Sequence, residues 1–346
     1  MSNLFLKMKN SSHTIPALTL SSGATLQEIV IAYNTMGELS PDGCNAVLLT
    51  HGYTSGQDMA LPGSSAVEGS WCEIVGPGKP IDTDRFFVVC PNMLGSSYGS
   101  TNAASVNPAT GRPYGSSFPD ITLADIVETQ RSLVDALGIK KLVAVVGPSF
   151  GGFQAFQWAI SYPDFVDGIA ALTSAPFCPA ADVAGIAKRL SSDPNWNGGD
   201  YYSGPGVKST VAKMRSETLK VFGIDAVLER QFPNAADRDV EIVRLAEEWA
   251  DKFDANSMLI LMKAAEVFDV RPHLDGVKAR VFLALSSTDR LFPTTMAEEV
   301  MQAFVRAGVT AEYHEIDSQF GHFASGVDAE KWSELLRTFI ARLTCR

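Results

Sequence analysis

The sequence predicts an α/β fold in which a mostly parallel central sheet carries helices on both faces. Short, wholly apolar runs alternate along the chain with amphipathic stretches of helical period, the order of elements found in α/β proteins. Most of these runs lack the polar alternation of a half-exposed strand, so we expect both of their faces to be covered. With 346 residues, of which 46% are hydrophobic, the chain is long enough to bury such a core without disulfides or metal ions.

Most of the expected strands are short apolar runs bounded by Gly, Pro or Asp. In chain order they are residues 28–39, 45–50, 85–90, 142–146, 168–172, 280–285 and 312–316. The first alternates partly between apolar and polar residues, whereas most of the others are almost uninterrupted apolar runs. The uninterrupted runs indicate strands in the middle of the sheet.

Helix signals lie between the strands. A capping box, Thr122-x-x-Asp125, predicts the start of a helix that ends at Gly138. A second helix is expected over 150–162, and Thr295-x-x-Glu298 predicts the start of a third. Apolar residues spaced three and four apart over 332–343 predict the last one.

The alternation of strands and helices stops between about residues 177 and 270. This stretch is helical in pattern, contains Pro- and Gly-rich turns, and is too long to be a simple loop. We therefore predict an α/β core formed by residues 1–176 and 271–346, with residues 177–270 inserted as a helical lid.

The strongest chemical signal is Gly147-x-Ser149-x-Gly151, which follows an apolar strand and opens a helix. A nucleophile elbow has this arrangement, because its serine occupies a strained turn that needs small neighbours. The first N–H groups of the following helix also point toward an oxygen that becomes negative during the reaction. Ser149 is the predicted nucleophile.

Such a serine needs a base, and the base needs an acid that fixes its tautomer. In elbow-containing folds these follow the serine in the order acid, then His. His322 lies in a loop between the last strand and the last helix, whereas His314 lies within that strand. Asp289 directly follows the strand over 280–285, and Asp317 is a rival candidate acid. We predict His322 as the base and Asp289 as its partner.

The loop after the strand over 45–50 is where this type of fold places its second oxyanion donor. We assign the oxyanion hole to the backbone N–H groups of Tyr53 and Phe150, while His51 is expected to shape the loop. No metal-ligand spacing occurs, so no metal cofactor is expected.

Composition excludes several classes of partner. The formal net charge is −11, and no run of Lys or Arg occurs, so a nucleic-acid surface is not expected. No apolar stretch approaches the ~20 residues of a membrane span, and the N-terminus lacks the apolar segment of a signal peptide. The five cysteines form no C-x-x-C pair and are expected to be free thiols. We expect a cytoplasmic protein.

Several longer motifs resemble the homoserine O-acetyltransferase family. They are residues 76–87 (GPGKPIDTDRFF), 92–95 (NMLG) with 98–101 (YGST), 107–114 (NPATGRPY), 193–202 (DPNWNGGDYY) and 253–257 (FDANS). The resemblance implies an α/β-hydrolase core, a helical lid over a tunnel, a homodimer built through the lid and a ping-pong reaction through an acyl-serine. It also implies acetyl-CoA as a co-substrate, with Ser149, Asp289 and His322 as the triad.

Two positions depart from what the resemblance implies for homoserine. Family members that use homoserine follow the catalytic His with Asp, which holds the amine, but Phe323 stands here. They also carry an Arg six residues before the Asp-Pro motif, where this chain has Ala187. Arg189 lies about 200° further around a helix, although Arg189 or Arg215 would serve if the lid helix were bent differently. Homoserine is therefore predicted not to be the substrate.

The sequence thus predicts acyl transfer through Ser149, with hydrolysis of a small apolar ester, thioester or related compound as the main interpretation. The first alternative is an acetyl-CoA-dependent O-acetyltransferase acting on homoserine or another alcohol. The second is a non-catalytic binding protein on the same scaffold. The residues expected to line the substrate pocket lie near the elbow loop, in the lid and next to the base. They are Thr54, Ala187, Tyr201, Tyr202 and Phe323.

Overall fold

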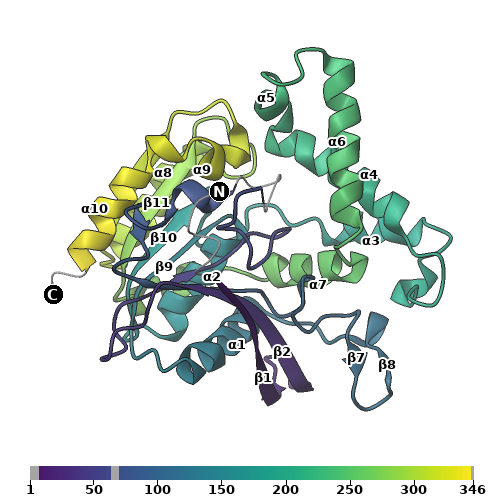
Figure 1. The fold of residues 1–346 in the computed structure, drawn as a ribbon, viewed down its shortest axis with the longest axis horizontal. Helices are drawn as coiled ribbons and strands as arrows, with labels where there is room; N and C mark the ends of the chain where they lie inside the picture. The colour runs from purple at the N-terminus through teal and green to yellow at the C-terminus, as the bar shows by residue number, and fades with distance from the viewer. Residues whose placement is uncertain (1–7, 64–69, 344–346) are drawn as a thin grey trace.

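The computed structural model describes residues 8–63 and 70–343, and its centre is an eight-stranded sheet (Figure 1). The strand order is β1-β2-β6-β3-β9-β10-β11-β12. These strands are β1 Lys9–Thr19, β2 Thr25–Met36, β6 Phe87–Pro91, β3 Ala46–Leu49, β9 Leu142–Pro148, β10 Val166–Leu172, β11 Arg280–Ser286 and β12 Ala311–Ile316. From β6 to β12 all neighbours run parallel, whereas β2 is antiparallel to β6 and β1 is antiparallel to β2. The predicted α/β fold class is confirmed.

Strand β1 was not expected from the sequence. Most of its side chains are exposed, and it contains the polar run KNSSHT, so it carries no apolar signal. Its backbone instead pairs with β2 over ten residue positions, from Lys9 opposite Thr35 to Thr19 opposite Thr25. Edge pairing of this kind depends on a partner strand and not on the strand's own composition. Two short pairs lie outside the sheet, β4 Val75–Gly76 with β5 Ile81–Asp82 and β7 Val106–Asn107 with β8 Arg112–Pro113.

Helices cover both faces of the sheet, as predicted. The core helices are α1 Leu123–Ala136, α2 Phe150–Ser161, α8 Ala297–Arg306, the short α9 Ala324–Val327 and α10 Ser333–Leu343. Alternate residues of β9 face opposite layers: Val145 packs in the cluster that contains α1, α2 and α8, and Val146 packs in the cluster that contains α10. A strand buried on both faces has no polar side, which explains its uninterrupted apolar sequence.

One of the two predicted capping boxes forms. The Thr122 side chain accepts from the backbone N–H of Asp125, and the Asp125 carboxylate accepts from the N–H of Thr122. Thr295 does not cap a helix: it lies inside a 3₁₀ turn over Thr294–Met296, and α8 begins at Ala297 without a side-chain cap. The prediction at Thr295 was wrong because the turn after Pro293 takes up the residues that a cap would need.

Five α-helices lie between β10 and β11 and form a lobe beside the sheet (Figure 1). They are α3 Val183–Ser191, α4 Lys208–Phe222, α5 Ile224–Leu228, α6 Ala235–Ala250 and α7 Ala255–Glu266. An isolated bridge between Phe177 and Asp269 joins the two ends of this segment. We call residues 177–270 the lid and the rest of the chain the core. This division is our interpretation of the position of the five α-helices.

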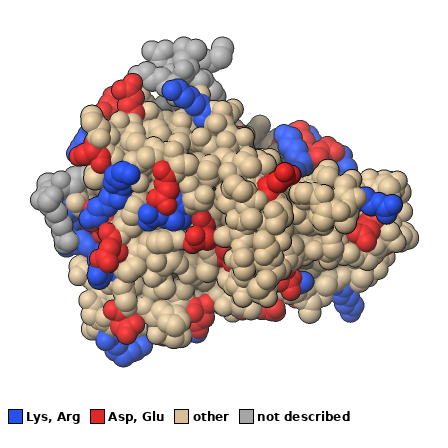
Figure 2. All heavy atoms as spheres, turned by 90° about the horizontal axis from the view of Figure 1, so that it is seen from below, with Lys and Arg blue, Asp and Glu red and all other residues tan. Residues whose placement is uncertain are grey.

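The surface carries both signs of charge. On the face shown in Figure 2, basic and acidic side chains are interspersed. Ion pairs of the described residues include Lys278 with Asp164. No helix within the described residues is long and apolar enough to cross a membrane. Cys44, Cys72, Cys90 and Cys178 are free thiols, while Cys345 and the first seven residues of the N-terminal segment lie outside the described residues.

Candidate active site

Ser149 occupies a strained turn between β9 and α2. Its backbone has φ 53° and ψ −121°, a conformation that costs a non-glycine residue about 1–3 kcal/mol. The flanking glycines permit a close approach of Thr50: a Cβ added to Gly147 would lie 2.3 Å from the Thr50 carbonyl oxygen, and one added to Gly151 would lie 2.0 Å from it. The Gly-x-Ser-x-Gly pattern therefore has a steric cause in this structure.

The end of β10 holds the turn in place. The Ser149 N–H donates to the Leu172 carbonyl at 2.8 Å, and the Ser174 hydroxyl donates to the Ser149 carbonyl at 2.7 Å. A Cβ on Gly152 would lie 2.3 Å from the Ser174 hydroxyl oxygen, so this second glycine is needed for the same contact. These contacts offset part of the strain and fix the direction of the Ser149 side chain.

Asp289 and His322 form a buried hydrogen bond. His322 Nδ1 lies 2.8 Å from Asp289 Oδ2, and both side chains are at most 2% exposed. The other carboxylate oxygen accepts from the backbone N–H groups of Leu291 at 2.8 Å and Phe292 at 3.3 Å. Burial by itself raises the pKa of Asp289, but the charge and hydrogen bond of His322 and the two N–H groups outweigh burial and hold this pKa below its usual value. The carboxylate is therefore ionised and available to orient the imidazole.

The other candidate acid and the other histidines lie outside the Asp289–His322 pair. Asp317 is exposed, and His314 stays within β12, where its ring stacks on Phe282 with centroids 4.7 Å apart. His51 shapes its loop, as expected: its Nε2 accepts from the Met93 N–H at 3.2 Å, and its Nδ1 contacts the Gly52 carbonyl. Since an N–H group occupies Nε2, the neutral ring carries its proton on Nδ1.

A cavity of about 350 Å³ lies at Ser149 between core and lid. The core supplies Tyr53, Ser149 and Phe150, and the rings of Tyr53 and Phe150 stack with centroids 6.2 Å apart. Within the described residues, the backbone N–H groups of Tyr53 and Phe150 make no hydrogen bond, as an oxyanion hole requires of its donors. No group of His, Cys, Asp and Glu in the described part of the chain has the arrangement of a metal site.

The lid supplies much of the remaining wall, mainly from three helices, and Phe153, Leu291 and Phe292 of the core supply the rest. Side chains from α3, α4 and α7 line it, and they are mostly apolar, for example Met214 and Met258. The charged exceptions are Asp182, Arg189 and Glu217, of which Arg189 and Glu217 form an ion pair at 2.5 Å with both side chains about half exposed. The cavity is thus apolar along most of its wall, with an exposed ion pair at its outer part.

Comparison with known proteins identifies the scaffold. Residues 45–211 match the model of the alpha/beta hydrolase fold family. The chain is 36% identical over 345 residues to a homoserine O-acetyltransferase of Haemophilus influenzae, covering 94% of this chain and 96% of that protein. A homoserine O-acetyltransferase of Geobacter sulfurreducens is 38% identical over 94% of this chain and 95% of its own length. This chain belongs to the homoserine O-acetyltransferase family.

Solved structures agree with this membership. The homoserine O-acetyltransferase of Bacillus anthracis superposes with a TM-score of 0.87 at 26% identity, over 96% of this chain and 98% of the other. Esterase E22 superposes with a TM-score of 0.86 at 25% identity, over 96% of this chain and 100% of the other. The chain is therefore an acyl-transfer enzyme on an α/β-hydrolase scaffold. The relatives support the acetyltransferase alternative better than the hydrolysis that the sequence favoured.

The expected substrate pocket needs correction. Among the described residues that line the Ser149 cavity, none is Thr54, Ala187, Tyr201, Tyr202 or Phe323. The Tyr201 and Tyr202 hydroxyls instead donate to the partly buried carboxylate of Asp254 at 2.7 and 3.2 Å, and both residues line a separate hollow. The Thr54 carbonyl accepts from Trp249 Nε1 at 3.0 Å.

The charged positions of the lid also differ from the expected register. Ala187 does not line the described cavity, whereas Arg189, two residues further along α3, does. Arg215 is almost fully buried on α4, with its guanidinium carbon 4.8 Å from the centroid of the Trp249 ring and 5.9 Å from that of Phe222. The cavity wall therefore holds a lid arginine, Arg189, although not at the position that the resemblance implies.

Phe323 packs against the lid. It is buried in a cluster with residues of α4, α5 and α6, and its ring meets Phe222 edge-on with centroids 6.1 Å apart. The position next to the base thus holds an aromatic ring and no carboxylate. Sequence reasoning also missed several wall residues, including Phe222 and Cys178, because nothing in their local sequence distinguishes a cavity wall from the core.

Cys178 is a second potential nucleophile in the cavity wall. Burial raises the pKa of its thiol, a hydrogen bond to the backbone of Ala180 acts in the opposite direction, and Glu266 raises it further. A thiol with a raised pKa stays protonated near neutral pH and reacts slowly. Ser149 is the better placed nucleophile.

Proposed function

We propose that the chain is an O-acyltransferase that moves an acetyl group from a thioester such as acetyl-CoA to Ser149 and then to an alcohol. The observation that carries the proposal is the lid-covered cavity at Ser149, with the buried Asp289–His322 pair beside it. The family relatives support the same class of reaction. In this proposal Ser149, His322 and Asp289 form a catalytic triad.

In the first half-reaction, Ser149 Oγ attacks the thioester carbonyl while His322 Nε2 takes its proton. The N–H groups of Tyr53 and Phe150 stabilise the oxyanion that forms. The C–S bond then breaks, and the thiolate leaves with the proton from His322. Asp289 keeps the imidazole in the tautomer that exposes Nε2 and stabilises the imidazolium.

In the second half-reaction, an alcohol occupies the space that the thiol has left. His322 takes the hydroxyl proton as the oxygen attacks the acyl carbonyl, and the proton then returns to Ser149 Oγ as the ester product leaves. The lid favours this step over hydrolysis to the extent that it excludes water from the cavity.

We propose an acceptor other than homoserine, without an ammonium group beside its hydroxyl. Phe323 places an aromatic ring next to His322, where an amine needs a carboxylate. Burying an ammonium there without a partner costs several kcal/mol. An apolar acceptor avoids this cost.

The deciding experiment mixes the enzyme with acetyl-CoA and measures free CoA by chromatography, with and without a panel of alcohols that includes L-homoserine. Chromatography is preferable to a thiol reagent because Cys178 lies in the cavity wall. We expect CoA release to depend on one or more alcohols and to be lost in Ser149→Ala. No release with any acceptor contradicts the proposal.

Hydrolysis is a second candidate, favoured by the apolar wall and by Phe323. The likeness to esterase E22 is in keeping with it. Water then attacks the acyl-enzyme in place of the alcohol. Turnover of a p-nitrophenyl ester, or release of CoA, at a rate that no alcohol raises supports hydrolysis and contradicts transfer.

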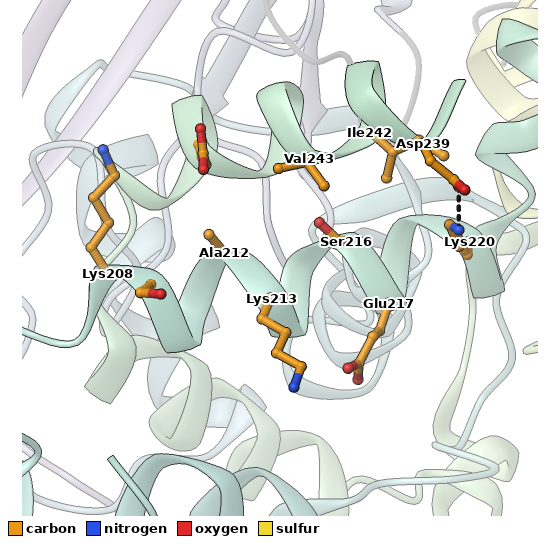
Figure 3. Close-up of a pocket in the computed structure, with 11 residues that line it drawn as sticks. Lys208, Ala212, Lys213, Ser216, Glu217, Lys220, Asp239, Ile242 and Val243 are labelled. Carbon is orange, nitrogen blue, oxygen red and sulfur yellow. Dashed lines mark hydrogen bonds and ion pairs between the residues drawn. The ribbon is translucent and has the colours of Figure 1, made fainter. Parts of the chain in front are cut away.

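We also propose a homodimer formed through the lid, as the family resemblance implies. A groove of about 840 Å³ runs between α4 and α6, and Figure 3 shows Ala212 and Ser216 on one side of it and Val243 on the other. Val240 and Val243 on α6 are 71% and 48% exposed. Lys220 of α4 already pairs with Asp239 of α6 within one chain, so the apolar side chains of the groove are what a second copy would cover.

Light scattering after size-exclusion chromatography tests the assembly. The wild type should have the mass of a dimer, and Val243→Asp should shift it toward a monomer. Val267→Asp is the matched control, because Val267 is 67% exposed but lies outside the groove. A monomeric wild type contradicts the proposal.

A further inference from the structure

We infer that Phe222, the last residue of lid helix α4, is a positioning residue that holds the His322 imidazole in its working orientation. This inference rests on the proposed function, in which His322 is the base. It gives the lid a direct part in the chemistry, in addition to covering the cavity.

The His322 ring contacts two phenylalanine rings. Phe292, from the loop after Asp289, stacks on it at an interplanar angle of 20° with centroids 5.8 Å apart. Phe222 approaches at 51° with centroids 4.7 Å apart. The hydrogen bond to Asp289 fixes Nδ1 but leaves the ring free to tilt about that bond. Contacts with these two rings restrict the tilt, and one of the rings belongs to the lid.

The backbone supports the same contact. A Cβ added to Gly321, the residue before His322, would lie 2.6 Å from the Phe222 carbonyl oxygen. A Cβ added to Gly223 would lie 3.2 Å from the Phe320 carbonyl oxygen. The φ angle is 56° at Gly321 and 100° at Gly223, values that glycine tolerates better than other residues. The two glycines therefore allow the end of α4 to pack directly on the loop that carries His322.

Two other contacts of Phe222 suggest alternative roles, one in the cavity wall and one in lid packing. It lines the Ser149 cavity, so its ring is also a candidate wall for the substrate. It also belongs to the lid cluster that contains Phe323, so its loss could lower stability alone. A wall residue affects mainly KM, a packing residue affects unfolding, and a positioning residue affects kcat through His322.

The test uses p-nitrophenyl acetate, because acylation of Ser149 by this ester needs the base but no acceptor. Phe222→Leu removes the ring and keeps apolar bulk, and Phe222→Met is a second such variant if Phe222→Leu does not fold. Phe222→Tyr keeps the ring. Phe232→Leu is the matched control, since Phe232 packs against the same lid cluster as Phe222 but does not line the cavity.

We expect Phe222→Leu to lower kcat by about tenfold to a hundredfold with KM changed by less than about threefold, the scale of a misplaced catalytic group. Phe222→Tyr should recover most of kcat, and Phe232→Leu should match the wild type. In a His322→Ala background, Phe222→Leu should change the residual rate by less than about twofold, because the group that it positions is gone.

The outcomes separate the inference from the proposed function. A wild type that does not react with the ester, or a His322→Ala variant as active as the wild type, contradicts the proposed function. If the wild type reacts and Phe222→Leu raises only KM, the positioning role is contradicted. It is also contradicted if Phe222→Leu lowers the rate by the same factor in the wild type and in the His322→Ala background. Full activity of Phe222→Leu contradicts it as well.

Discussion

His322 Nδ1 lies 2.8 Å from Asp289 Oδ2, although helix α8 and strand β12 separate the two residues in the chain. The hydrogen bond is buried and the carboxylate is also held by two backbone N–H groups. A carboxylate fixed in this way can select one imidazole tautomer, which is the role that the proposed mechanism gives it.

Asp289→Asn should therefore lower kcat by about three to four orders of magnitude and leave KM little changed, because an amide does not enforce the required tautomer. Steady-state turnover of p-nitrophenyl acetate measures the effect. Asp317→Asn is the control, since Asp317 is exposed and follows the same edge of the sheet. Equal activity of the two variants contradicts the assignment of the acid.

The same carboxylate predicts a pH dependence of stability. The pKa of the Asp289 carboxyl is lower in the folded protein than in the unfolded chain, where it is about 3.9. The ionised carboxylate therefore stabilises the fold at pH values above about 3.9. This contribution is lost as the pH falls through the lower pKa of the folded protein. The difference in free energy of unfolding between wild type and Asp289→Asn should be present near pH 6 and shrink below about pH 4. Urea unfolding at several pH values measures it, and a difference that grows on acidification contradicts the argument.

Gly151→Ala should destabilise the fold strongly. Its Cβ would lie 2.0 Å from the Thr50 carbonyl oxygen, and neither backbone can move without breaking the elbow. We expect a loss of about 2–4 kcal/mol or a failure to fold. Gly204→Ala is the control, because its nearest neighbour would lie at an ordinary 3.6 Å. Similar melting temperatures for both variants contradict the steric account of the motif.

Asp254→Ala should lower stability without changing the chemistry at Ser149. Asp254 accepts from Tyr201, Tyr202 and the N–H of Ser257, and it caps α7. Its removal leaves these donors unpaired and should cost about 2–4 kcal/mol. The rate at which a phosphonate ester labels Ser149 should stay near that of the wild type at low temperature. A large fall in labelling, with stability unchanged, means that Tyr201 and Tyr202 act in the substrate site after all.

Phe323→Asp should give measurable CoA release that depends on L-homoserine, while the wild type shows none. The change places a carboxylate next to the base, at a cost of about 2–4 kcal/mol in stability for burying a charge. Ala187→Arg should add little to this variant, because Arg189 on the same helix already lines the cavity. Phe323→Leu is the control and should gain nothing. Efficient use of L-homoserine by the wild type contradicts the proposed acceptor class.

The sequence by itself determined the features that depend on local rules. The apolar run of β9 reveals a strand buried on both faces, and the Thr122–Asp125 capping box reveals the start of α1, because both signals act over a few neighbouring residues. The elbow at Ser149 is equally local, since its glycines are needed at fixed distances from the serine. The order of Ser149, Asp289 and His322 along the chain then identified the triad candidates.

The tertiary structure decided the features that depend on contacts between distant segments. Strand β1 forms because β2 offers an edge, and Tyr201 turns away from the Ser149 cavity because Asp254 accepts its hydroxyl. The cavity wall and the contact between Phe222 and His322 come from a lid helix packing on a loop about 100 residues away in the chain. Local patterns report which face of an element is apolar, and only packing determines which partner that face meets.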